Sequence, residues 1–119
     1  MKTGALSLVV AMALLVATPI AAGRAKMCPQ LDGKQITVIG VVRNRMIGGQ
    51  QEPGQAPSSY FDLENPTWKC KFKKVAVDYP GHVLWCAEGR HAEIIGTYHD
   101  ASELLPGYYV IDATDVRCR

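Results

Sequence analysis

Near the C-terminal end of the chain, the stretch GRHAEIIGTYHD contains four residues whose types suit metal binding or proton transfer: His91, Glu93, His99 and Asp100. Imidazole and carboxylate groups are frequent zinc ligands and frequent general acids and bases. The residues alternate as in a strand, and a strand advances about 3.3 Å per residue, so the two histidines should lie roughly 26 Å apart. His99 and Asp100, being adjacent, should point to opposite faces. Unless the strand bends sharply at Gly96, we expect no metal or catalytic site here.

The same stretch is instead typical of a strand in the wall of a barrel, over residues 91–99. One set of alternating side chains should face outward, and the other set should fill or border the core. The outward set is His91, Glu93 and Thr97, and the inward set is Ala92, Ile94 and Tyr98.

Other parts of the chain predict the elements around this strand. Alternating apolar runs bounded by Gly, Pro, Asn and Asp indicate β-strands, and the Gly- and Pro-rich stretch NRMIGGQQEPGQAPSS between the first two runs indicates a long loop. The stretch HVLWCAEG has the length of a two-turn helix, with Val83, Leu84 and Trp85 available to cover one end of a core. The expected order is a first strand in KQITVIGVVRN, a second in SSYFDLEN, a third at 72–79, the helix at 82–89, and strands at 91–99 and 108–118.

This order resembles the OB-fold, a five-stranded Greek-key barrel with a helix between its third and fourth strands. The segments ITVIGVVRN, YFDLEN, VAVDY, GRHAEIIGTY and YYVIDATDV carry the resemblance, and they are spread from residue 36 to residue 116, over most of the length of the domain. Gly40 and Gly96 match the positions at which strands one and four lie side by side and the barrel wall bends. The pattern looks most like small exported bacterial OB domains similar to anticodon-binding modules. It implies a mainly β fold class.

The first residues predict export. Lys2 precedes an apolar run from Ala5 to Val16, and TPIAAG supplies small residues for cleavage after Gly23, as in a signal peptide. The run is shorter than the roughly 20 residues of a membrane span. We therefore expect a signal peptide at 1–23, one OB-fold domain at 24–119, no membrane span after cleavage, and a secreted or periplasmic location; a retained N-terminal anchor is the alternative. The remaining 12 basic and 11 acidic residues (13 − 1 and 11 − 0) do not favour a polyanion partner.

Four cysteines in an exported chain of this length predict two disulfides. Their spacing contains no CxxC pair and no nearby histidine in a zinc-finger pattern, which argues against zinc. Three pairings are open, and the simplest joins the ends of the domain as Cys28–Cys118 and leaves Cys70–Cys86.

The resemblance implies a ligand site across the faces of strands two and three and between the loops that follow strands one and four. Aromatic and basic side chains in those regions suit an extended ligand. The alternative is that the lysines only keep a strand soluble and that Trp68 packs beside a Cys70 disulfide. The candidate ligand-binding residues are Arg43, Arg45, Tyr60, Trp68, Lys69, Lys71, Lys73, Lys74 and His99.

These features predict a binding module without catalytic machinery. The chain has no G-x-S-x-G motif, no phosphate-binding glycine loop, and no counterpart of the active-site motifs of secreted OB-fold nucleases. We expect no cofactor and no metal, and an oligosaccharide, a peptide or another extended molecule as ligand. A structural or assembly subunit with a protein partner is the alternative, and single-stranded nucleic acid is the least favoured ligand.

Overall fold

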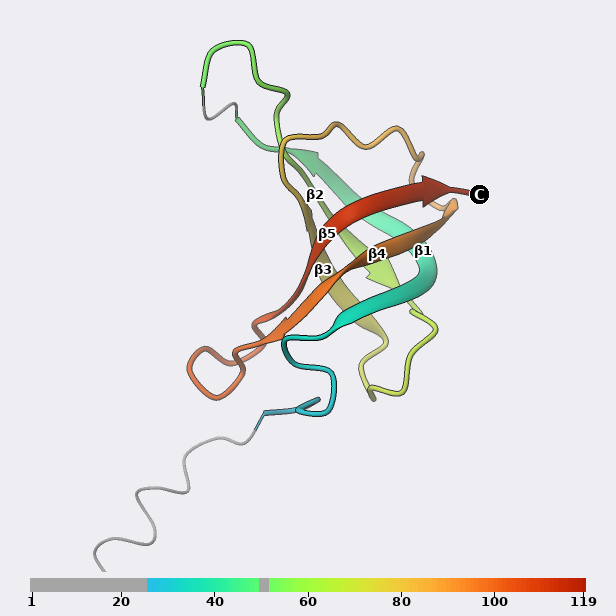
Figure 1. Ribbon diagram of the computed structural model, residues 1–119. Helices are drawn as coiled ribbons and strands as arrows, with labels where there is room; N and C mark the ends of the chain where they lie inside the picture. The colour runs from blue at the N-terminus through green and yellow to red at the C-terminus, as the bar shows by residue number, and fades with distance from the viewer. Residues whose placement is uncertain (1–25, 50–51) are drawn as a thin grey trace, which may run out of the picture.

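Five β-strands form a closed barrel in the computed structural model, which describes residues 26–49 and 52–119 (Figure 1). Around the barrel the order is β1-β2-β3-β5-β4, and β4 pairs back with β1. Neighbours are antiparallel except for β3 and β5, which are parallel. The strands are β1 (Gln35–Ile47), β2 (Ser59–Glu64), β3 (Lys74–Tyr79), β4 (His91–Asp100) and β5 (Tyr109–Cys118).

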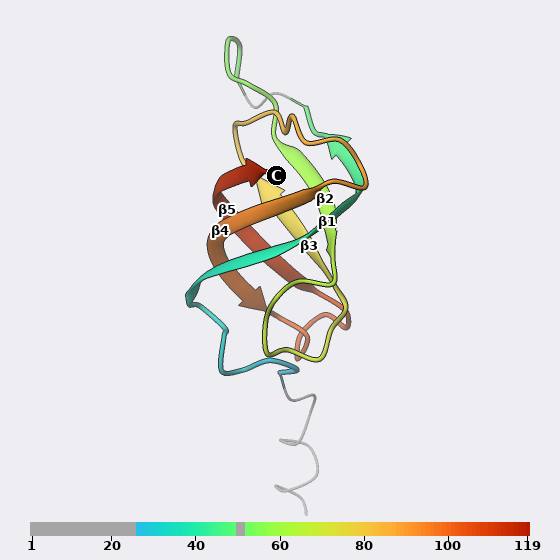
Figure 2. The same cartoon turned by 90° about the vertical axis from the view of Figure 1, so that its right-hand side faces the viewer.

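This arrangement confirms the mainly β fold class and the five predicted strands, and it is consistent with an OB-like barrel. The predicted signal peptide at 1–23 lies outside the described residues. Turned by 90°, the strands wrap around one interior, with the connecting segments gathered at the two ends of the barrel (Figure 2).

Alternating side chains fill that interior. In β4, Ala92, Ile94 and Tyr98 are buried, whereas His91 and His99 are exposed, as the alternation predicts. Every strand contributes in this way, because removing apolar side chains from water stabilises the barrel and fixes the register of each strand. The buried apolar side chains of the strands are Val38, Val42, Phe61, Leu63, Val75, Val77, Ala92, Ile94, Tyr98, Ile111 and Ala113.

Glycines occupy two points where backbones meet closely. A Cβ atom at Gly96 would collide with the carbonyl oxygen of Asp112 and lie 2.7 Å from the Cα atom of Ala113. A Cβ atom at Gly40 would lie 2.6 Å from the Leu63 side chain. The β4–β5 register shifts between Ile95 and Gly96, so this glycine permits the irregularity at which the wall bends.

The predicted short helix is wrong, since none of residues 82–89 is helical. The Ser59 side chain at the start of β2 holds this segment instead. Its hydroxyl accepts a hydrogen bond from the N–H of Leu84 and donates one to the carbonyl oxygen of His82, each at 2.8 Å. Such bonds to backbone groups compete with helical ones and fix another conformation.

Burial along this segment also follows an extended chain. Leu84 and Cys86 are buried, but Trp85 between them is 86 % exposed. The expectation that Trp85 covers the core is therefore wrong, and Leu84 alone of the three predicted residues is fully buried there.

Two disulfides form, but the simplest pairing is wrong. Cys28 bonds to Cys70 and Cys86 bonds to Cys118, with Cα–Cα distances of 5.8 and 5.3 Å. Strand β4 explains the difference. Cys118 pairs with Ala92 at its start, whereas Cys28 binds the Asp100 side chain at its end. Eight strand residues, or roughly 26 Å, therefore separate Cys28 from Cys118.

Candidate ligand-binding groove

An open groove with a volume of about 610 Å³ lies on the outer face of β2 and β3. Residues from the end of β1 form one border, and the turn before β5 forms the other. A smaller hollow shares four of its residues and continues it toward Lys74 at the start of β3. The groove is lined by Asn44, Arg45, Met46, Tyr60, Phe61, Asp62, Ala76, Val77, Asp78, Gly107, Tyr108, Tyr109 and Val110.

The strand register places three polar side chains in a row across this face. Tyr60 on β2 lies opposite Asp78 on β3, and Asp78 lies beside Asp112 on β5. Their neighbours Phe61, Val77 and Ile111 are buried in the barrel, so the three alternate with the core and project outward. We call these three residues the Tyr60–Asp78–Asp112 row.

Asp78 is the unusual member of the row. Its Oδ1 atom is buried and has no hydrogen-bond partner in the described part of the chain. Burial raises the pKa of Asp78, and the nearby Asp112 carboxylate raises it further. Because buried polar atoms nearly always have partners, Asp78 is a carboxylate that the described residues leave incompletely satisfied, and a cation bound beside it would stabilise its charged form.

The arginines near the groove already have partners. Arg43 Nε donates to Glu64 Oε1 at 2.9 Å. Arg45 lines the groove, but its Nη1 atom donates to the carbonyl oxygen of Cys86 at 2.6 Å. The expected basic character of the site is thus reduced, whereas the acidic Asp78 has an unused oxygen.

The predicted lysines and His99 lie around the groove or away from it. Lys74 lies at its extension and is 3.8 Å from Asp62 Oδ2. Lys71 and Lys73 are exposed on the loop between β2 and β3, and like Lys69 on that loop they do not line the groove. His99 is exposed on β4, one strand beyond β5. The structure therefore brings only Arg45 and Tyr60 of the predicted set together in the main groove.

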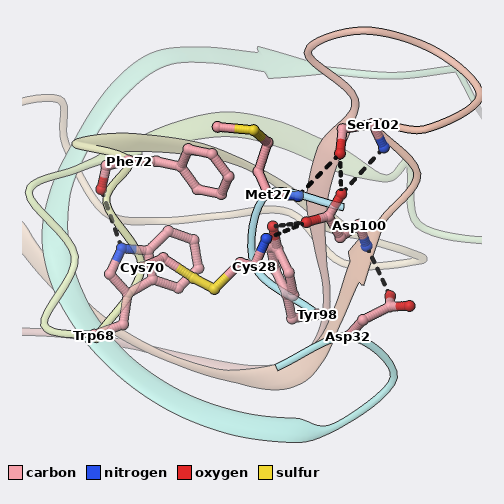
Figure 3. The surroundings of a disulfide bond; sticks show 9 residues. All are labelled: Met27, Cys28, Asp32, Trp68, Cys70, Phe72, Tyr98, Asp100 and Ser102. Carbon is pink, nitrogen blue, oxygen red and sulfur yellow. Dashed lines mark hydrogen bonds between the residues drawn. A yellow bond between two sulfur atoms is a disulfide. The ribbon is translucent and has the colours of Figure 1, made fainter. Parts of the chain in front are cut away.

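Trp68 packs in an aromatic cluster beside the Cys28–Cys70 disulfide (Figure 3). Its ring meets Tyr98 and Phe72 edge-on, with centroids 5.4 and 5.9 Å apart, and its Nε1–H donates to the Phe72 carbonyl oxygen at 3.1 Å. This matches the packing alternative for Trp68 and places it outside the groove.

Asp100 organises the same end of the barrel (Figure 3). Its carboxylate accepts hydrogen bonds from the backbone N–H groups of Cys28 at 2.7 Å and Ser102 at 3.1 Å, and from the hydroxyls of Ser102 and Tyr98. Burial raises the pKa of Asp100, but these hydrogen bonds outweigh it and hold the pKa below its ordinary value. Burial also raises the pKa of Tyr98. These polar groups are hydrogen-bonded to one another and to the backbone, and so they stabilise the fold.

No protein-family model, curated protein or solved structure matches the chain. Within residues 26–49 and 52–119, no group of three or more His, Cys, Asp and Glu side chains is arranged to hold a metal ion. No helix among these residues is long and apolar enough to cross a membrane.

Proposed function

We propose that the chain is an exported OB-type binding module, without catalytic activity, that holds an extended ligand bearing a basic group on the outer face of β2 and β3. The Tyr60–Asp78–Asp112 row, of which Tyr60 and Asp78 line the groove and Asp112 lies beside Asp78, is the observation that carries this proposal. A guanidinium or ammonium group in the groove can form an ion pair with the Asp78 carboxylate while its stem packs against the exposed Tyr60 ring. The two disulfides are compatible with an oxidising compartment.

The charge of the groove supports a basic ligand over a polyanion. Its lining includes Asp62 and Asp78, with Asp112 adjacent, against the single cation Arg45. A phosphate backbone placed here would meet like charges, and proteins that bind single strands present the opposite potential. A peptide with Arg or Lys side chains fits this charge better.

The test is an NMR amide-shift titration with four probes: hexa-arginine, hexaglutamate, chitohexaose and a thymidine decanucleotide. We expect hexa-arginine alone to shift amides of β2, β3 and residues 107–110. The double variant Tyr60→Ala, Tyr108→Ala should abolish these shifts, whereas Trp85→Ala, which removes an exposed aromatic ring outside the groove, should leave them unchanged. Shifts confined to other surfaces would reject the groove as the site.

A second measurement tests whether the ligand is recognised by its basic group and not only by the shape of the groove. Asp78→Asn keeps the size of the side chain but removes its charge, so it should weaken hexa-arginine binding by about tenfold, the equivalent of about 1.4 kcal/mol. Groove binding by chitohexaose with no response to hexa-arginine would retain the binding module and reject the basic ligand.

A structural or assembly role is the second candidate, and it rests on a surface that adjoins the groove and shares Met46 with it. The Arg45 bonds to Cys86 and Glu88 bring the end of β1 beside the 82–89 segment. Met46, Ile47 and Trp85 are exposed there, at 65, 58 and 86 %. If this surface assembles, sedimentation will show a concentration-dependent mass that Ile47→Ser, Trp85→Ser removes; a strictly monomeric chain at high concentration would exclude self-assembly.

A further inference from the structure

Three segments meet at the end of the barrel that carries the Cys28–Cys70 disulfide. They are residues 26–34, 66–73 and 101–108, and we call them the lysine end. The disulfide joins the first segment to the second, and Ser102 accepts a hydrogen bond from the Met27 N–H at 3.3 Å and so joins the first to the third. Figures 1 and 2 show all three at the same end of the barrel.

Large apolar side chains of this end lie in water. Leu104 and Leu105, in the 101–108 loop, are 83 and 58 % exposed, and Met27 is 58 % exposed. The loop around the leucines is closed by its own backbone, since the N–H groups of both donate to the carbonyl oxygen of Ala101. A structured loop that exposes two adjacent leucines is unfavourable in water unless another apolar phase receives them.

The charged side chains at this end are mainly cationic. Lys34, Lys69, Lys71 and Lys73 are exposed, and none of the four forms an ion pair within the described residues. The two exposed or partly exposed acidic residues there, Asp32 and Glu103, both contact Lys26.

From this juxtaposition we infer that the lysine end docks on an anionic lipid surface. The leucines enter the boundary between headgroups and acyl chains, and the lysines meet the negatively charged headgroups. Charge complementarity selects this partner, because the unpaired lysines attract an anionic surface and the leucines need an apolar layer directly beneath it. The lysines of WKCKFKK, which lie outside the main groove, thereby gain a role independent of the groove.

The structure also explains how the lysines are presented. Trp68 and Phe72, which alternate with the lysines, pack inward against Tyr98 and Tyr109, with the rings of Phe72 and Tyr109 stacked at 4.1 Å. Cys70 is held by its disulfide. These anchors keep the loop in place, so docking costs little conformational entropy.

The test is co-sedimentation of the exported chain with vesicles of phosphatidylcholine, either alone or with 30 % phosphatidylglycerol. Intact-mass spectrometry first identifies the N-terminal residue of the protein that is used. We expect binding only to the anionic vesicles, and a loss of at least tenfold in affinity when NaCl rises from 50 to 500 mM. Two variants should each weaken binding by at least tenfold. One is the double substitution Leu104→Ser with Leu105→Ser, and the other is the triple substitution Lys69→Gln with Lys71→Gln and Lys73→Gln.

Trp85→Ser and Arg117→Gln are the matched controls, because they remove an exposed apolar and an exposed basic side chain away from the lysine end. Both should bind vesicles as the unchanged chain does, and circular dichroism should show that every variant remains folded. Absence of binding to anionic vesicles at 50 mM NaCl would overturn the inference. So would binding that the leucine variant retains, since that result indicates a surface for soluble polyanions; a parallel titration with hexaglutamate detects that case.

Discussion

At the scale of single residues, Asp100 links folding to pH. Its side chain is only 3 % exposed, and hydrogen bonds from Ser102, Cys28 and Tyr98 hold its pKa below the ordinary value despite its burial. A carboxyl whose pKa is lower in the folded than in the unfolded state stabilises the fold above its unfolded pKa, about 3.9, and this contribution is lost as the pH falls through the folded pKa.

We therefore expect the free energy of unfolding to decrease as the pH falls below about 4. Asp100→Asn replaces one acceptor oxygen with a donor and should lower that free energy at pH 7 by about 2–4 kcal/mol, because buried N–H groups lose a charged partner. Urea unfolding followed by circular dichroism from pH 2.5 to pH 7 measures both effects. The pH dependence should be shallower in the variant, and identical slopes would contradict the assignment.

The contribution of Asp78 to stability depends on pH in the opposite direction. Burial raises its pKa in the fold, so its contribution favours the folded state below the unfolded pKa and is lost as the pH rises through the folded pKa. Asp78→Asn should therefore raise the free energy of unfolding at pH 7 by about 0.5–1 kcal/mol, and it should have little effect at pH 3. A variant that is less stable at pH 7 would show that the carboxylate has a structural partner. A gain in stability with a loss of hexa-arginine binding is the result typical of a functional side chain.

At the scale of elements, the β4–β5 pair depends on Gly96. A side chain there would meet the backbone of Asp112 and Ala113, which cannot move without breaking the ladder. Gly96→Ala should cost at least about 3 kcal/mol of the free energy of unfolding. Gly49→Ala is the control, since no atom lies within 4 Å of its Cβ position, and it should change that free energy by less than about 0.5 kcal/mol. Thermal unfolding of both variants measures this difference, and equal midpoint temperatures would contradict the close contact at Gly96.

The strands were predictable because each one alternates more buried with more exposed residues over at least part of its length, as Phe61 and Leu63 do against Tyr60 in β2. That signal is local. The 82–89 segment was misread because its conformation is set from outside, by the Ser59 hydroxyl 25 residues before Leu84. A serine at the start of a strand carries no mark in the sequence of the role it plays in another segment.

At the scale of the whole molecule, the face of the groove was predictable but its chemistry was not. The resemblance implies a ligand site on strands two and three; a groove lies there and Tyr60 lines it, while ligand binding stays a prediction. Asp78 is outward-facing by the alternation of VAVDY, yet only the parallel β3–β5 contact brings Asp112 beside it. The lysines next to Trp68 in the sequence belong to a loop at the end of the barrel, and the ring of Trp68 points away from them into the core. The pairing of β3 with β5, which closes the barrel, therefore determines which charged side chains lie at the groove.

Each disulfide lies at one end of the barrel, and each disulfide can be removed separately by mutation. The disulfides close loops of 42 and 32 residues, so on the chain-entropy account the loss of either one should lower the free energy of unfolding by about 4 kcal/mol. The first double variant is Cys28→Ser with Cys70→Ser, and the second is Cys86→Ser with Cys118→Ser. The first variant frees the lysine end, so vesicle binding should weaken while hexa-arginine still binds the groove. The second frees the 82–89 segment, which Arg45 contacts at the border of the groove, so hexa-arginine binding should weaken while vesicle binding is kept.

A tryptic map without reduction verifies the connectivity on which this rests, because cleavage after lysine and arginine should leave peptide 27–34 linked to 70–71 and peptide 75–90 linked to 118–119. A link between 27–34 and 118–119 would contradict the pairing. Urea unfolding of both variants then supplies the stabilities, and equal losses of vesicle and hexa-arginine binding in the two would show that the ends are not independent.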